Sequence, residues 1–238
     1  MSSLSTSLDT NGYGGRMSRL PFKIVGFDLD GTLLDTAADL GAAVNHALAL
    51  VGRAAVPPER VSALIGGGSR LMLARALALT GGAENIDLPP LYAALLAHYE
   101  ANIAVHTRLY PGGAAMLDAL AASSAKLAVV TNKPERLALK LLGELGLLAR
   151  FDCVIGGGSP GIAALKPAPD PLHAMTRRLG GGAAAFVGDS SFDIRAARAA
   201  GLPSVAVSFG FNDLPVDELG ADAVIDHFDE LIPVLAAL

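Results

Sequence analysis

The sequence predicts an α/β fold in which helices wrap a parallel sheet and an all-helical region is inserted after the first strand. From residue 110 onward, short apolar runs alternate with longer amphipathic runs, and this alternation is typical of parallel strands joined by helices. The run of about seventy residues after the first strand is helical in period, and it is too long for a single crossover connection. We therefore expect a Rossmann-like sheet domain that carries a smaller helical cap domain.

The composition limits the partners that the chain can have. A net charge of −5 disfavours nucleic-acid binding, because the positive surface that a phosphate backbone requires is missing. The chain has 238 residues, enough to bury a core, and its single cysteine cannot form an internal disulfide. It contains neither an uncharged apolar stretch of membrane-spanning length nor a signal-peptide pattern. We expect a cytoplasmic monomer or homodimer with no membrane or nucleic-acid partner.

Changes of pattern along the chain predict the domain boundaries. Residues 1–20 are rich in serine, threonine and glycine, and we expect them to form a disordered tail. The sheet domain is expected to comprise residues 21–35 and 108–238. The helical cap domain is expected to comprise residues 36–107, with hinges near Thr36 and in residues 109–113.

The elements can be assigned in chain order. The first strand, 24–27, reads as buried on both faces, and Gly31 marks a sharp turn after it. In the cap we expect helices at 37–51, from 57, at 69–79 and at 88–104, the first of them opened by a capping box of Thr36 and Asp39. The sheet domain should continue with helices at 114–122, 134–145, 169–179, 193–200 and 228–235, and with strands at 126–130, 153–155, 183–187, 204–207 and 223–225.

Polar residues follow several of these strands. Asp28 and Asp30 come directly after the first strand, Thr131-Asn132-Lys133 after the second, and Gly188-Asp189 after the strand at 183–187. Ligands of open α/β sheets bind at the carboxyl ends of the strands, so these groups should gather at one edge. Taken singly, each also fits a structural role as a turn former or as an acid at a helix start.

Together these residue types favour phosphoryl chemistry assisted by magnesium. Carboxylates at Asp28, Asp30 and Asp189 are the hard oxygen ligands that Mg²⁺ prefers, and no His/Cys cluster has the spacing of a zinc site. Once a cation offsets the acids, a carboxylate can attack phosphorus. Hydroxyl, amide and ammonium donors that could surround a phosphate are present at Thr131, Asn132 and Lys166.

The joint pattern resembles a known family. Asp28-x-Asp30-Gly31-Thr32, Thr131, Lys166-Pro167 and Gly188-Asp189-Ser190-x-x-Asp193 resemble the four sequential motifs of the haloacid dehalogenase-like phosphohydrolases. The resemblance implies that Asp28 is the nucleophile, that Asp30 is the general acid and base, and that an aspartyl-phosphate forms. It further implies a role for each remaining residue: Mg²⁺ held by Asp28, the main-chain carbonyl of Asp30 and Asp189, with Asp193 in support, and phosphate bound by Thr131, Asn132 and Lys166.

Within that family, residues 129–134, the Lys166-Pro167 loop and residues 201–212 are most similar to phosphoglycolate phosphatases. The resemblance therefore implies a small anionic phosphate ester as substrate, with 2-phosphoglycolate as the first choice. In the cap, the glycine-rich start of a helix at Gly68, Ser69 and Arg70 could receive the substrate's carboxylate, because bare amides at a helix N-terminus favour an anion. An ordinary helix start is the alternative.

Other functions remain open at this point. A phosphosugar mutase or a pyrophosphatase of the same fold would use the same residues. A dehalogenase is disfavoured, because the resemblance implies that dehalogenases lack an acid at the position of Asp30. A phosphate- or nucleotide-binding module is suggested by the glycine runs, but they do not form G-x-G-x-x-G after a strand or a P-loop.

Overall fold

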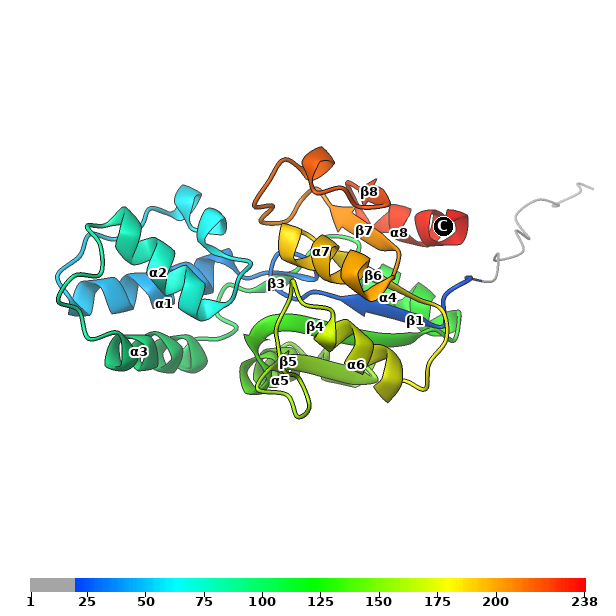
Figure 1. Ribbon diagram of the computed structural model, residues 1–238, viewed down its shortest axis with the longest axis horizontal. Helices are drawn as coiled ribbons and strands as arrows, with labels where there is room; N and C mark the ends of the chain where they lie inside the picture. The colour runs from blue at the N-terminus through cyan, green and yellow to red at the C-terminus, as the bar shows by residue number, and fades with distance from the viewer. Residues whose placement is uncertain (1–19) are drawn as a thin grey trace, which may run out of the picture.

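The computed structural model describes residues 20–238 and contains a six-stranded sheet in the order β5-β4-β1-β6-β7-β8 (Figure 1). Every neighbouring pair of strands is parallel, which confirms the predicted α/β class. Of the tail expected at residues 1–20, all but Leu20 lie outside the described residues. In sheet order the strands are Cys153–Gly157, Lys126–Pro134, Ile24–Phe27, Ala184–Gly188, Ser204–Val207 and Ala223–Ile225.

Helices cover both faces of the sheet because the central strand β1 is apolar on both sides. Val25 and Phe27 belong to a core cluster with residues of α4, α5 and α8, whereas Ile24 packs in a second cluster with α6 and α7. Gly26 lets α6 approach closely, since a Cβ there would lie 2.4 Å from the sulfur of Met175. The five helices are Gly113–Ala122, Glu135–Glu144, Asp170–Arg178, Ser191–Ala200 and Leu231–Ala237.

Helices α1, α2 and α3 form a separate group beside the strand ends (Figure 1). We call residues 36–107 the insert; its helices are α1 (Ala37–Leu50), α2 (Ser69–Leu79) and α3 (Leu88–Ala101). The prediction of a regular helix from residue 57 is wrong, because the chain forms two 3₁₀ turns, Pro58–Arg60 and Ser62–Leu64, before the glycine run. Helix α3 ends earlier than predicted, where the side-chain amide of Asn102 donates to the carbonyl of His98 at 2.9 Å.

A small antiparallel pair of strands joins the insert to the sheet. Strands β2 (Leu34–Asp35) and β3 (Arg108–Leu109) were not predicted, since two residues carry no periodicity. The predicted capping box at Thr36 and Asp39 is also wrong. Asp39 instead accepts hydrogen bonds from the amides of His106 and Thr107 and from the Thr107 hydroxyl at 2.8–3.0 Å. Its carboxylate therefore ties the start of the insert to its end.

No helix among residues 20–238 has the length and apolar character needed to cross a membrane. The parallel sheet has a different consequence for function. The carboxyl ends of β1, β4 and β6 point toward the insert (Figure 1). The polar residues that follow β1 and β6 are thus placed between the two parts of the molecule. Thr131, Asn132 and Lys133 lie there too, but inside β4, which continues to Pro134 and is longer than the predicted strand 126–130.

Candidate active site

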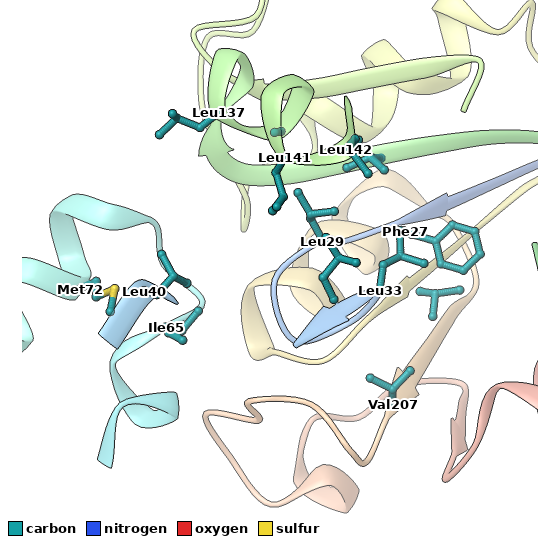
Figure 2. Close-up of a cluster of buried hydrophobic side chains, with 14 of the residues drawn as sticks. Phe27, Leu29, Leu33, Leu40, Ile65, Met72, Leu137, Leu141, Leu142 and Val207 are labelled. Carbon is teal, nitrogen blue, oxygen red and sulfur yellow. The ribbon is translucent and has the colours of Figure 1, made fainter. Parts of the chain in front are cut away.

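The loop after β1 is held by its own apolar residues. Leu29 and Leu33 are fully buried and lie under the turn beside Phe27 (Figure 2), and the amides of Leu33 and Leu34 donate to the carbonyl of Leu29. Gly31 has φ +87°, and a Cβ there would lie 2.3 Å from a carboxylate oxygen of Asp189. Alternate residues of the loop therefore face inward, and Asp28 and Asp30 line a cavity at the sheet edge.

Three acids meet at this edge. Ligand oxygens of Asp28, Asp189 and Asp193 all lie within 4.8 Å of one another, and all three residues are buried. Burial raises the pKa of Asp28 from 3.8 to about 6, although the charge of Lys166 opposes this shift. Burial and the neighbouring charges of Asp193 and Asp28 raise the pKa of Asp189 well above 3.8. Burial thus disfavours the ionised forms of both carboxyl groups in the absence of a bound cation.

Lys166 is the cation inside this cluster. Its ammonium lies 2.9 Å from Asp28 Oδ1 and donates to Asp193 Oδ1 at 2.6 Å and to the carbonyl of Val130 at 2.7 Å. Burial alone would lower the pKa of Lys166, but the charges of Asp193 and Asp28 outweigh burial and raise it. Lys166 is therefore held as an ammonium next to Asp28, where it can offset a second anion.

The three acids differ in how many hydrogen bonds their carboxylate oxygens already accept. Asp193 Oδ2 accepts from the amide and hydroxyl of Ser190 in a capping box at the start of α7, so both of its oxygens are bonded. Asp189 accepts one bond at each oxygen, from Thr32 Oγ1 and from the amide of Phe211, both at 2.8 Å. Asp28 Oδ1 is buried, and its charged neighbour is the Lys166 ammonium at 2.9 Å, which is not aligned for a regular hydrogen bond. Asp28 and Asp189 therefore have capacity left for a ligand.

Asp30 has a partner that was not predicted. Lys133 Nζ donates to both carboxylate oxygens of Asp30 at 2.7 Å. The Lys133 ammonium also lies 4.6 Å from the centre of the Tyr99 ring, which belongs to α3 of the insert. Lys133 directly follows Thr131-Asn132 at the end of the strand, so the rule that placed those two residues at the edge also applied to it. Tyr99 offered no such signal, because in the sequence it resembles a core residue of an apolar helix.

The two residues before Lys133 have different hydrogen-bonding roles. Thr131 Oγ1 accepts from the amide of Lys133 at 3.2 Å, and no described acceptor takes its proton. The side-chain amide of Asn132 donates to the carbonyl of Lys166 at 3.0 Å and to that of Gly66 at 3.4 Å. Thr131 can therefore donate to an anion as it stands, whereas the Asn132 side chain holds the Lys166 loop and touches the insert.

A cavity of about 40 Å³ lies between the strand ends and the insert. Gly68 and Ser69 line it, whereas Arg70 does not and instead stacks on the Tyr92 ring at 4.3 Å. Leu40, Ile65 and Met72 form the insert's side of the cavity, opposite Leu137 of α5 (Figure 2). A volume of this size accommodates a few water molecules. A second cavity of about 420 Å³ shares Gly68, Ser69, Asn132 and Pro134 with it and has Arg70 in its lining.

Residues 25–207 match the family described as haloacid dehalogenase-like hydrolase. The chain belongs to this family. The resemblance inferred from the four motifs is thus confirmed. A protein of Agrobacterium fabrum named phosphoglycolate phosphatase is 43% identical over 212 residues, or 88% of this chain and 90% of that protein. Another of that name, from Rhodospirillum rubrum, is 41% identical over 216 residues, or 88% of this chain and 89% of that protein.

The fold agrees with the same family. The crystal structure of a predicted phosphoglycolate phosphatase from Haemophilus somnus superimposes with a TM-score of 0.84 at 31% identity. The match covers 90% of this chain and 98% of that one. The insert and the sheet are thus both parts of an arrangement that this relative shares.

Proposed function

We propose that this protein is a magnesium-dependent phosphatase that hydrolyses 2-phosphoglycolate to glycolate and phosphate. The observation that carries the proposal is the geometry at Asp28, a buried carboxylate whose Oδ1 forms an ion pair with the Lys166 ammonium at 2.9 Å without the alignment of a regular hydrogen bond. A phosphoryl group placed there would meet a nucleophile and a charge that offsets its own. Relatives that bear the name phosphoglycolate phosphatase support the choice of substrate.

The proposed reaction has two steps. In the first, an oxygen of Asp28 bonds to phosphorus while the phosphorus–oxygen ester bond breaks, and Asp30 gives a proton to the leaving alkoxide to yield glycolate. In the second, Asp30 takes a proton from a water molecule, which attacks phosphorus and releases phosphate and the free carboxylate of Asp28. Thr131 and Lys166 bind the phosphoryl oxygens in both steps. Asp30 must part from Lys133 before it can carry the proton.

The acidic cluster suits a magnesium ion. Its donors are all oxygens, and burial raises the pKa values of Asp28 and Asp189, as expected of acids arranged to share a cation. Asp28, Asp189 and the main-chain carbonyl of Asp30 would hold the ion, with Asp193 in support through Lys166. When bound, Mg²⁺ would offset the charge of the acids and of the phosphate.

The insert is proposed to act as a cap. Its side of the cavity is apolar, which would exclude water from the phosphorylated aspartate. The β2–β3 pair and the bonds of Asp39 confine the two connections to one place, so a motion of the insert would bend the chain near Thr36 and residues 109–113.

A substrate panel tests the function. We expect the highest kcat/KM for 2-phosphoglycolate, lower values for hexose phosphates, pyrophosphate and nucleotides, and loss of turnover in EDTA that Mg²⁺ restores. Glycolate and phosphate should appear in equal amounts. A phosphosugar isomer as the product would instead identify a mutase, and a preference for pyrophosphate a pyrophosphatase. Full function in Asp28→Asn would indicate a binding module and contradict the proposal.

A further inference from the structure

The cavity has a second cationic feature, at its insert-facing side. Lys133 is the only cationic residue among the described residues that line the cavity, and its side chain is buried. Lys166, by contrast, has its ammonium enclosed by Asp28, Asp193 and a main-chain carbonyl. The site therefore has two cations at different places, Lys133 in the lining of the cavity and Lys166 outside that lining, in contact with Asp28 and Asp193.

Tyr99 supplies an unused polar group at the same place. Its side chain lines the cavity and is 2% exposed, and its hydroxyl makes no hydrogen bond of regular geometry with residues 20–238, although the Lys133 ammonium lies close enough to interact with it. Buried tyrosine hydroxyls usually find a partner, and a buried polar group without one lowers stability by about 1–3 kcal/mol. The ring also faces the Lys133 ammonium at 4.6 Å. A ligand with an acceptor oxygen here would complete the site.

The rest of the insert's wall has few polar side chains: Gly66, Gly68 and Ser69 also line it, and the Ser69 hydroxyl is already paired with the Tyr92 hydroxyl at 2.8 Å. Leu40, Ile65, Met72 and Leu95 are apolar. Arg70, which the sequence suggested for this role, is exposed and stacks on Tyr92 outside the lining. A carboxylate held against this wall without a cation would be costly, so its place is beside Lys133.

We propose that Lys133 and Tyr99 form the subsite for the substrate's carboxylate, with the ammonium as its counter-ion and the hydroxyl as its hydrogen-bond donor. The proposal rests on the proposed function and names the residues that select the substrate. As the substrate binds, its carboxylate replaces Asp30 at Lys133 Nζ, and the insert supplies the second donor when it closes. A site built in this way rejects an ester that lacks the carboxylate, because its polar groups are then left unpaired.

The test compares 2-phosphoglycolate with ethyl phosphate, which replaces the carboxylate by a methyl group. For the wild type we expect kcat/KM to favour 2-phosphoglycolate by about 10³-fold. Lys133→Met should reduce this ratio by about 10²-fold, Tyr99→Phe by about fivefold, and Lys133→Arg should retain most of it. Lys140→Met, an exposed lysine of α5, is the matched control and should leave the ratio unchanged. Loss of Asp30's partner affects both esters alike, so the ratio isolates the carboxylate.

Binding gives a second readout that does not depend on turnover. In the Asp28→Asn background, calorimetric titration with the two esters should show the same loss of preference when Lys133→Met is added. A wild type that prefers 2-phosphoglycolate and a Lys133→Met variant that keeps that preference would overturn the subsite. So would loss of the preference in Arg70→Ala but not in Lys133→Met. Absence of turnover for every ester, with the binding preference intact, would reject the proposed function alone.

Discussion

The two walls of the cavity differ in the interactions that hold their side chains in place. On the sheet side, charges are bonded to one another within a rigid frame, as in the contacts of Lys166 with Asp28 and Asp193 and of Thr32 with Asp189. On the insert side, most groups are apolar, and the polar hydroxyl of Tyr99 makes no regular hydrogen bond with the described residues. Both walls retain buried polar atoms without a hydrogen bond from the described residues, Asp28 Oδ1 and Asn132 Oδ1 on the sheet side and the Tyr99 hydroxyl on the insert side, but only the sheet side also holds charged groups already paired with one another.

This difference suggests that the two walls have separate roles in catalysis and in substrate selection. A rigid set of donors is suited to phosphoryl transfer, whose transition state needs preorganised charge. A wall that can move and that lacks a partner for one polar group is suited to selecting a substrate. Perturbing the sheet side should therefore affect stability and chemistry together, and perturbing the insert side should affect selection with a smaller effect on folding.

The largest effect is expected at Lys166. Lys166→Met leaves Asp28 and Asp193 buried without their cation, and breaking a buried ion pair on one side costs about 3–5 kcal/mol. We expect that loss in the free energy of unfolding measured with urea in EDTA, and a fall in kcat/KM of at least about 10²-fold at saturating Mg²⁺. Lys140→Met removes an exposed lysine and should change neither. A Lys166→Met protein that kept its activity would remove the contrast between the walls.

Next in size is the tie between the ends of the insert. Asp39→Ala leaves three donors of His106 and Thr107 without their carboxylate, which should lower stability by about 3 kcal/mol. Asp39→Asn, which keeps an acceptor, should lose less. Hydrogen exchange should show amides of α1 and α3 losing protection while those of β1 and β6 keep theirs. Equal loss in both regions would mean that insert and sheet unfold as one unit.

The parts that were predictable from the sequence are those fixed by local pattern. Strands at 204–207 and 223–225 match the structure residue for residue. Short apolar runs bounded by turn residues are typical of buried strands. The strand-end rule brought Asp28, Thr131 and Asp189 to one edge, since parallel strands share their direction.

The parts that were not predictable depend on how the insert docks. Thr36 and Asp39 fit a capping box locally, but tertiary donors at residues 106 and 107 take the carboxylate instead. The pairing of Lys133 with Asp30 spans 103 positions, and its contact with Tyr99 crosses from sheet to insert. Neither contact affects the hydrophobic periodicity or the motif spacing of the sequence, so neither could be predicted from them.

An effect of similar size at pH 7 is expected from the charge of Asp28 itself. A carboxyl whose pKa is about 6 when folded and 3.8 when unfolded binds its proton more tightly in the folded protein. In EDTA, its contribution therefore lowers stability as pH rises from about 4 to about 6, and no further change follows above that range. Asp28→Asn removes this penalty. Urea titrations should find the variant more stable than the wild type by about 3 kcal/mol at pH 7 and by less than about 1 kcal/mol at pH 4.

Adding Mg²⁺ provides a second comparison of the stability of Asp28→Asn with that of the wild type. Because the ion binds the folded wild type, adding Mg²⁺ should raise wild-type stability and remove the advantage of Asp28→Asn at pH 7. An advantage of the same size at pH 4 as at pH 7 would show that the asparagine acts through packing and not through charge.

The smallest effect is expected where the two walls meet at the surface. Glu100 of α3 pairs with Arg136 of α5, and the side chains are 41% and 55% exposed. Exposed ion pairs contribute about 0–1 kcal/mol and weaken with salt. A double-mutant cycle of Glu100→Gln and Arg136→Gln should therefore give a coupling free energy near 0.5 kcal/mol in low salt and close to zero in high salt. KM for 2-phosphoglycolate should change less than about threefold. A coupling above about 2 kcal/mol would mean that surface charge, and not the closure of an apolar wall over Lys133 and Tyr99, holds the insert against the sheet.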